Sequence, residues 1–395
     1  MRTVIVLAAF AFPLANCSGS TGPAVPKQTL QGDLQQDLQS YLTQRSSIEH
    51  ISTLSLTVSF RGSQAPISAA IGTTSYGGAQ SVTPQNLFQI GSNTKAFTSA
   101  VILNLEAQGL LSIHDTVGKW LPQYPAWANV TIQQLLDMTS GIPTYDGVSA
   151  FESAYASNPL MQFTPAQLVN YAYPQIQANS GFSYSNTNYI LAQMIVDAAS
   201  PSHDYQTELE NLIGRLGLTD VFYEPDFYPS SVMDRLVKGY YVNTDDTGPL
   251  SALLNTETST YSLGWTQAAG GIIATPLALT SWVRDLFEGN VLAPQQLKEL
   301  ESLVAIPGGE PITSTSSSQP QGFGLGLFQI TMPPMGTFWG YQGSTIGYRA
   351  SYMYLPSDGL IVTVFTNSQT SAADNTLNTV LLPAIYNTLK AAGKV

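Results

Sequence analysis

Residues 87–98 of the chain read LFQIGSNTKAFT, and the rest of the sequence is organised around them. A short apolar run ends at Gly91, and the apolar residues that follow Ser92 recur with the period of a helix. Ser92 is therefore expected at the start of a helix, beside unsatisfied backbone N–H groups and the positive end of the helix dipole. Lys95 follows about one helical turn later, so its amine should lie over the Ser92 hydroxyl.

This spacing suits nucleophilic catalysis. Serine is a poor nucleophile until a base takes its proton, and a desolvated neutral lysine can be that base. The simpler interpretation is a serine N-cap followed by a solvated lysine. Two observations favour catalysis. Of the seven lysines, only Lys95 has a serine three residues earlier, and the helix that carries it is apolar over most of its faces. Burying an unpaired ammonium is costly, so a lysine there needs an explanation.

Composition narrows the class of protein. With 395 residues, the chain is long enough for one large domain or two of ordinary size, and 44% apolar residues suit a packed globular protein. The net charge of −12 argues against nucleic acid as a partner, because nucleic-acid binding depends on Lys and Arg. A single cysteine permits no intrachain disulfide. No His, Cys and carboxylate residues cluster at metal-ligand spacing, so we expect no metal and no cofactor.

The first residues predict export. Arg2 precedes an apolar run over residues 4–14, which is too short to span a bilayer and is typical of a secretory signal. We expect a signal peptide over residues 1–16 and a flexible tether, rich in Gly and Pro, over residues 17–28. The protein should therefore be periplasmic or extracellular.

Cys17, the only cysteine, follows this apolar run directly. The sequence LANC at residues 14–17 resembles the lipobox of bacterial lipoproteins, in which the cysteine becomes the lipidated first residue. Asn16 departs from the small residue usual at that position. An ordinary cleaved signal with an incidental cysteine is the alternative; we slightly favour lipidation, which would anchor the protein to a membrane.

Strand patterns lie at both ends of the chain, at residues 53–60, 66–71, 324–331, 337–341, 348–355 and 360–366. The turn sequence PSDG at residues 356–359 predicts a hairpin between the last two. Helical patterns lie at residues 30–45 and 376–391 and dominate the middle. We predict an α/β fold of the α+β type, in which an antiparallel sheet from both chain ends is flanked by helices and carries an inserted, mainly helical subdomain. A single catalytic domain should cover residues 29–395, with the sheet from about 29–90 and 300–395 and the helical subdomain at about 91–299.

A second candidate motif is the polar cluster at residues 184–188, which precedes an apolar helical run. Near Lys95, the Tyr184 hydroxyl could act as a phenolate or a proton relay, because a neighbouring cation lowers the pKa of a tyrosine. The Asn186 amide could hold a substrate carbonyl or the Lys95 amine. Taken alone, this cluster is better interpreted as a helix cap and a core tyrosine.

The third candidate motif is FWGYQGSTIGY at residues 338–348. A strand that ends in Gly343 would let a substrate backbone lie against it as an additional strand. The Ser344 N–H could join that of Ser92 as an oxyanion hole. Taken alone, a glycine-containing loop between strands is the better interpretation.

The three motifs together, in this order, resemble those of the serine β-lactamase-type hydrolases, which include class C β-lactamases, D-alanyl-D-alanine carboxypeptidases and related carboxylesterases. Their pattern is Ser-x-x-Lys, then Tyr-x-Asn, then Lys- or His-x-Gly. The resemblance covers about residues 30–390. Further matches lie at residues 110–115, 135–143, 269–275 and 323–326.

The resemblance implies a β-lactamase/transpeptidase-like fold and acyl-enzyme chemistry on an ester or amide. Ser92 would be the nucleophile, and Lys95 and Tyr184 would share the general-base work. Asn186 would bind substrate, and the N–H groups of Ser92 and Ser344 would form the oxyanion hole.

One position departs from the family pattern, because Tyr341 stands before Gln342 and Gly343 where relatives carry Lys or His. Tyr341 has no charge at neutral pH. We therefore expect short neutral esters to be better substrates than penicillins or D-Ala-D-Ala peptides. Arg349 could supply the missing charge if it turned toward the cleft, although a solvated arginine at a strand edge is the simpler interpretation.

Other functions remain open. A Ser-His-Asp hydrolase is disfavoured, because the chain has three histidines and no Gly-x-Ser-x-Gly elbow. A penicillin-binding or cell-wall-peptide-sensing protein with little turnover is the main alternative. The intact Ser92, Lys95 and Tyr184 argue against it, whereas Tyr341 keeps it open. In either case we expect a small-molecule or peptide ligand and a monomer.

Overall fold

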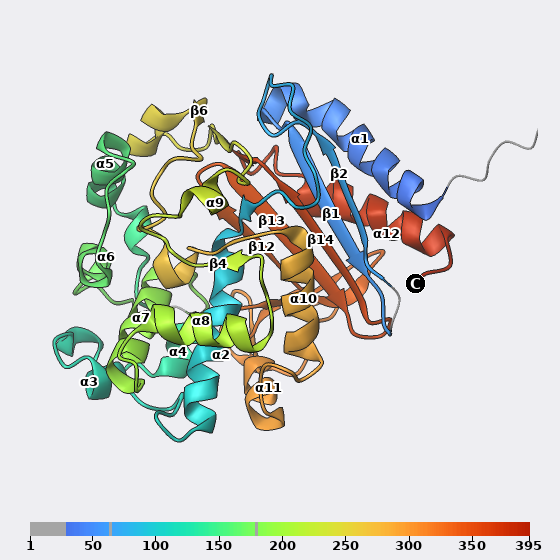
Figure 1. Ribbon diagram of the computed structural model, residues 1–395. Coiled ribbons are helices and arrows are strands. Elements are labelled where there is room, and N and C mark those ends of the chain that lie inside the picture. Colours follow the sequence, from blue (N-terminus) through green and yellow to red (C-terminus); the bar gives the residue numbers. More distant parts are fainter. Residues whose placement is uncertain (1–28, 63–64, 178–180) are drawn as a thin grey trace, which may run out of the picture.

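The computed structural model describes residues 29–62, 65–177 and 181–395. Its largest sheet has nine strands in the order β2-β1-β14-β13-β12-β11-β10-β8-β9, and each neighbouring pair is antiparallel. These strands are β1 (Thr53–Ser59), β2 (Ile67–Gly72), β8 (Leu303–Ala305), β9 (Pro311–Ile312), β10 (Gln321–Phe323), β11 (Phe328–Met332), β12 (Gly336–Thr345), β13 (Tyr348–Leu355) and β14 (Leu360–Thr366). The amino-terminal β1 lies between β2 and the carboxy-terminal β14 (Figure 1). The predicted fold class, with a sheet from both chain ends, is confirmed.

Both faces of this sheet are buried, which explains the mostly apolar sequence of β14, one of its central strands. In β14, the side chains of Ile361 and Phe365 belong to one core, and those of Val362 and Val364 belong to the other. The second core is closed by α1 (Leu30–Glu49) and α12 (Leu382–Ala391), which lie side by side on one face (Figure 1). The helix predicted over residues 376–391 is thus present, with a π-helical first turn, η6 (Leu377–Leu381).

The helical region packs on the other face. Its helices are α2 (Thr94–Ala107), α3 (Val117–Trp120), α4 (Ile132–Leu136), α5 (Ser149–Ser157), α6 (Pro165–Ala172), α7 (Asn186–Ala199), α8 (Tyr205–Arg215), α9 (Ser230–Met233), α10 (Pro276–Phe287) and α11 (Pro294–Leu300). Helix α2 is buried over most of its surface, and Phe97 stacks on Trp282 of α10 with ring centres 3.7 Å apart. The apolar stretch after Ser92 indicated a buried helix, and α2 is that helix.

Two three-stranded sheets join these layers, and neither sheet was predicted. One contains β3 (Phe88–Gln89), β4 (Val221–Phe222) and β7 (Ile273–Ala274); the other contains β5 (Tyr240–Val242), β6 (Thr256–Glu257) and β15 (Ser368–Thr370). Strands of two or three residues are too short to show an alternating pattern.

The strand predicted over residues 324–331 is wrong in part, because the chain turns between β10 and β11. Gly324 N–H donates to the Leu327 carbonyl at 2.8 Å, and Gly326 has φ +90°, which favours glycine. A Cβ on Gly326 would lie 2.9 Å from the Lys95 carbonyl oxygen, so this turn packs directly on α2.

Both expectations for Arg349 are wrong. Its side chain is 0% exposed, and its guanidinium pairs with the buried Glu49 carboxylate at the end of α1 and donates to Ser368 O at 2.7 Å. The reason is strand alternation, because Arg349 points to the face covered by α1, whereas Tyr341 packs in the core on the opposite face. Arg349 therefore cannot contribute charge to a site beside Tyr341.

The predicted signal peptide (residues 1–16), the tether (17–28) and Cys17 lie outside the described residues. Within the described ranges, no helix combines the length and the hydropathy that a membrane span requires.

Candidate active site

Ser92 lies in a 3₁₀ turn, η1 (Gly91–Asn93), that leads into α2. Glycines let this turn touch β12: a Cβ on Gly91 would lie 2.6 Å from Ser344 N, and a Cβ on Gly343 would lie 2.0 Å from Ile90 O. The Asn93 side chain donates to the backbone oxygen of Ile90 at 2.8 Å and to that of Ala350, on β13, at 2.9 Å. Ser92 is therefore held at a fixed position against the edge of the sheet.

Lys95 is 0% exposed, and its amine has three partners. Lys95 Nζ lies 2.9 Å from Ser92 Oγ, 2.7 Å from Asn186 Oδ1 and 2.7 Å from the Ala269 carbonyl oxygen. Burial lowers the pKa of Lys95 to about 7, although the charge of Asp146 acts in the opposite direction and raises it. A substantial share of the amine is then neutral near pH 7.

The partners fix where a neutral amine points its lone pair. A neutral amine has two N–H donors and one lone pair. The carbonyl oxygens of Ala269 and of the Asn186 side chain can only accept, so they take the two N–H groups. The lone pair of Lys95 is left facing the Ser92 hydroxyl, which is the arrangement that a general base requires.

Two tyrosine hydroxyls extend this site. The Tyr184 hydroxyl donates to Ser92 Oγ at 2.7 Å, and the Tyr341 hydroxyl donates to the Tyr184 hydroxyl at 2.9 Å. Tyr341 is 4% exposed and lies against the ring of Phe328, with centres 5.0 Å apart. Tyr184 as a residue is 37% exposed, but its hydroxyl points inward to these partners.

The expected lowering of the Tyr184 pKa is wrong. Burial raises the pKa of Tyr184 above its ordinary value, and its hydrogen bonds with Ser92 and Tyr341 only partly oppose this. Burial likewise raises the pKa of Tyr341 well above 10. A cation beside the Tyr184 ring, with Lys95 Nζ 5.0 Å from the ring centre, does not outweigh desolvation of the phenolate. Both tyrosines are therefore hydroxyl donors at neutral pH.

The last part of β12, which is no longer paired with β11, lies next to Ser92. Pairing with β11 stops at Gly340, so residues 341–345 present that edge to η1. The contact of Gly91 with Ser344 makes the backbones of Ser92 and Ser344 neighbours. The predicted site residues in the described chain thus lie together: Lys95 and Tyr184 contact the Ser92 hydroxyl, Asn186 and Tyr341 contact those two residues, and Gly343 and Ser344 adjoin the backbone at Ser92.

Asp146, Thr144 and Ala269 belong to the site and were not predicted. Asp146 Oδ2 accepts from Asn186 Nδ2 at 2.7 Å, and Asp146 Oδ1 accepts from the Thr144 hydroxyl. Ala269 ends a 3₁₀ turn, η5 (Gln267–Ala269), and binds Lys95 through its carbonyl. Their neighbouring segments matched family signatures, but a loop carboxylate and a backbone carbonyl leave no pattern of their own in a sequence.

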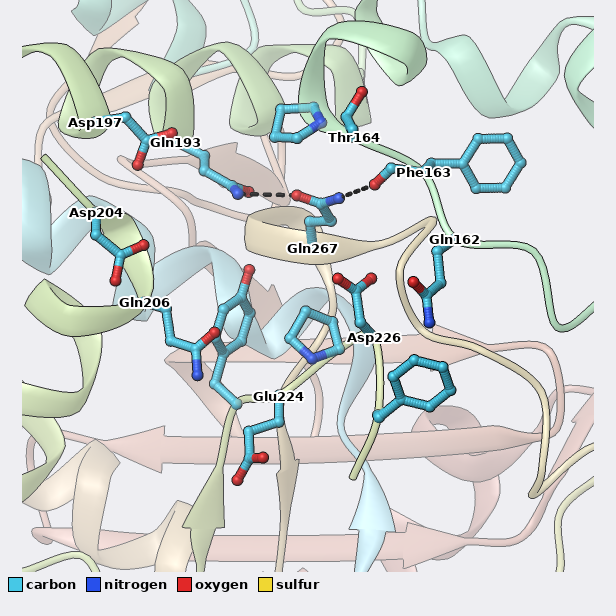
Figure 2. A pocket seen from close by; sticks show the side chains of 14 residues that line it. Gln162, Phe163, Thr164, Gln193, Asp197, Asp204, Gln206, Glu224, Asp226 and Gln267 are labelled. Atoms are coloured by element: carbon cyan, nitrogen blue, oxygen red, sulfur yellow. Dashed lines mark hydrogen bonds between the residues drawn. The ribbon is translucent and has the colours of Figure 1, made fainter. Parts of the chain in front are cut away.

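A cavity of about 710 Å³ lies elsewhere in the helical region (Figure 2). None of the residues around Ser92 described above lines it, and it has no serine or lysine. Its wall includes Gln267, whose side chain donates to Phe163 O and accepts from Gln193 Nε2 (Figure 2). This cavity is therefore distinct from the site around Ser92, although Gln267 belongs to the same turn as Ala269.

Solved structures share this fold. D-amino acid amidase from Ochrobactrum anthropi SV3 superposes with a TM-score of 0.75 at 21% identity, covering 92% of this chain and 99% of that one. D-stereospecific amidohydrolase from Streptomyces sp. gives 0.70 at 23% identity, covering 85% and 94%. The octameric penicillin-binding protein homologue from Pyrococcus abyssi gives 0.70 at 20%, covering 91% and 77%.

Penicillin-binding protein 4* of Bacillus subtilis (strain 168) is 37% identical over 118 residues, which make up 29% of this chain and 26% of that protein. The match thus covers about a quarter of the relative's length. A match to the family model "Beta-lactamase" is much longer and covers residues 39–384. The chain therefore belongs to the Beta-lactamase family of serine hydrolases.

Proposed function

We propose that this protein is an exported serine hydrolase that cleaves an ester or amide through an acyl-enzyme on Ser92. The observation that carries the proposal is the contact of Lys95 Nζ with Ser92 Oγ at 2.9 Å, made by an amine whose pKa burial lowers to about 7. Such a group can take the serine proton at neutral pH.

The reaction has two halves. Ser92 Oγ attacks the substrate carbonyl carbon while its proton passes to Lys95, and the N–H groups of Ser92 and Ser344 stabilise the negative oxygen that forms. The bond to the leaving group then breaks, and the proton held by Lys95 returns to the leaving atom. The Tyr184 hydroxyl, 2.7 Å from Ser92 Oγ, is a hydrogen-bond donor beside the attacking oxygen. Water then attacks the acyl-enzyme in the same way and releases the acid.

The charges around Ser92 support neutral substrates. In the described part of the chain, Lys95 is buried, Tyr341 is uncharged, and Arg349 is paired on the other face of the sheet. Asp146 adds a carboxylate. A substrate carboxylate would lack a charge-assisted partner, which costs about 1.5–3 kcal/mol. We therefore rank small neutral esters and amides above penicillins and D-Ala-D-Ala peptides.

D-aminoacyl amides should also be assayed as substrates, because two structural neighbours are named D-amino acid amidase and D-stereospecific amidohydrolase. Their identity to this chain is below 25%, so they motivate the compound and do not assign it. A lipid anchor on Cys17 and a monomeric state remain proposals from the sequence, and the octameric neighbour makes a measured molecular mass worthwhile.

The test combines labelling with turnover. A fluorophosphonate should label the wild type, and peptide mapping should locate the adduct on Ser92; Ser92→Ala should not be labelled. The wild type should release p-nitrophenol from a short ester over many cycles. Stoichiometric labelling without product release would instead support the alternative, a penicillin-binding or cell-wall-peptide-sensing protein. Full labelling of Ser92→Ala would contradict both.

A further inference from the structure

We infer that Asp146 is a positioning residue, which fixes the orientation of the Asn186 amide and thereby aims the Lys95 lone pair at Ser92. This inference rests on the proposed function, in which Lys95 is the base. Within the described residues, Asp146 makes no hydrogen bond with Ser92, and it acts through Asn186.

Hydrogen bonds connect the segment around Asp146 to the first residues of α7. Asp146 lies in a 3₁₀ turn, η3 (Tyr145–Gly147), and its two carboxylate oxygens accept from the Thr144 hydroxyl and from Asn186 Nδ2. The Thr144 hydroxyl oxygen accepts from the Asn186 backbone N–H at 3.1 Å, and the Tyr145 N–H donates to Thr187 Oγ1 at 2.9 Å. The carboxylate therefore has a defined position relative to Asn186.

The carboxylate decides which end of the amide faces Lys95. An ionised carboxylate can only accept hydrogen bonds, so the Asn186 NH₂ group must face Asp146 and its oxygen must face Lys95. Without Asp146, the amide could rotate and turn its NH₂ group toward the amine. The lone pair of a neutral Lys95 would then be drawn to Asn186, and the Ser92 hydroxyl would lose its acceptor.

The negative charge of Asp146 should also affect the pKa of Lys95, which can be measured separately from the rate. The groups that face Lys95 are the rings of Tyr184 and Tyr189, 5.0 and 5.4 Å from Nζ, and the Asp146 carboxylate behind Asn186. The negative charge of Asp146 stabilises the ammonium form and so raises the pKa of Lys95. Removing that charge should lower this pKa, and the neutral amine should then persist to lower pH.

The experiment compares Asp146→Ala, Asp146→Asn and the control Glu152→Gln. Glu152 is close enough to Asp146 for the two charges to interact, but in the described structure it does not hydrogen-bond to Asn186. The rate of Ser92 inactivation by a fluorophosphonate is measured across pH. At the high-pH plateau, Asp146→Ala should be slower by about ten- to a hundredfold, the worth of a hydrogen bond to a charged group. Asp146→Asn retains an acceptor for Asn186 and should lose less.

In both Asp146 variants the acid limb of the profile should move to lower pH, whereas Glu152→Gln should behave like the wild type. Lower plateaus with an unmoved acid limb would indicate a merely structural role and overturn the inference, as would a plateau unchanged in Asp146→Ala.

A second readout does not depend on reactivity. The ¹³C resonance of the Lys95 ε-carbon, identified by its loss in Lys95→Ala, reports the ionisation of the amine. Its midpoint should fall in Asp146→Asn relative to the wild type, and an unchanged midpoint overturns the inference. A wild type that the fluorophosphonate fails to label would refute the proposed function, while this titration still decides the role of Asp146.

Discussion

Replacing Tyr341 with phenylalanine tests the tyrosine that stands where relatives carry Lys or His. The change removes one hydroxyl, which donates to the Tyr184 hydroxyl 2.9 Å away. The ring is buried against Phe323 and Phe328, so a phenylalanine fills the same space and the fold should persist. The effect on rate should therefore come from the lost hydrogen bond alone.

One neutral hydrogen bond contributes about 0.5–1.5 kcal/mol, which corresponds to about a two- to twelvefold loss of kcat/KM on a p-nitrophenyl ester. Tyr184→Phe removes the hydroxyl that contacts Ser92 Oγ and should cost about 10²- to 10⁴-fold. Because Tyr341 acts through Tyr184, the double variant should be no slower than Tyr184→Phe, a non-additivity expected of groups that act as a unit.

Tyr223→Phe is the matched control. Its hydroxyl is buried, and among the described residues it has no hydrogen-bond partner, so its loss should leave kcat/KM unchanged. The reasoning fails if Tyr341→Phe is as fast as the wild type, or if it slows the enzyme as much in the Tyr184→Phe background as in the wild type.

Three further predictions concern the pH dependence of the rate, the stability of the fold and lipid attachment. The kcat/KM for a neutral ester should rise with pH through about 7 and then level off, because deprotonation of Lys95 creates the base; a pH-rate profile flat across that range would contradict this. Arg349→Met should lower the free energy of unfolding in urea by about 3–5 kcal/mol, because the buried Glu49 carboxylate loses its fully buried partner and keeps only its pair with Arg45. Arg235→Met breaks a half-exposed pair with Asp220 and should cost at most about 1 kcal/mol, so equal losses would refute the burial argument. Metabolic labelling should attach palmitate to the wild type but not to Cys17→Ser; no label on the wild type would indicate ordinary cleavage.

The sequence was most informative where local patterns and tertiary structure agree. The strands at residues 348–355 and 360–366 were predicted with their observed bounds, because both are rich in aromatic and β-branched or other apolar residues and a strong turn sequence separates them. Ser92 and Lys95 share one helical turn, so their proximity follows from spacing alone.

Tertiary contacts decide what the sequence could not show. Asp146 looks like any loop carboxylate until the η3 turn meets α7, and Arg349 looks exposed until α1 covers its face of the sheet. The pKa of Tyr184 depends on how completely its hydroxyl is desolvated, which is a property of the packed site and not of its neighbours in the chain.

The position of β1 in the sheet has a consequence for biosynthesis. The Thr366 hydroxyl donates to Thr53 O across 313 residues of chain, and α1 is covered by α12 near the carboxyl terminus. The sheet therefore cannot close on the ribosome until nearly the whole polypeptide has emerged, and contacts this distant in sequence form slowly. Such a chain keeps the apolar faces of β1 and α1 uncovered until β14 and α12 have been made, so its aggregation during synthesis should depend on how quickly these two elements dock.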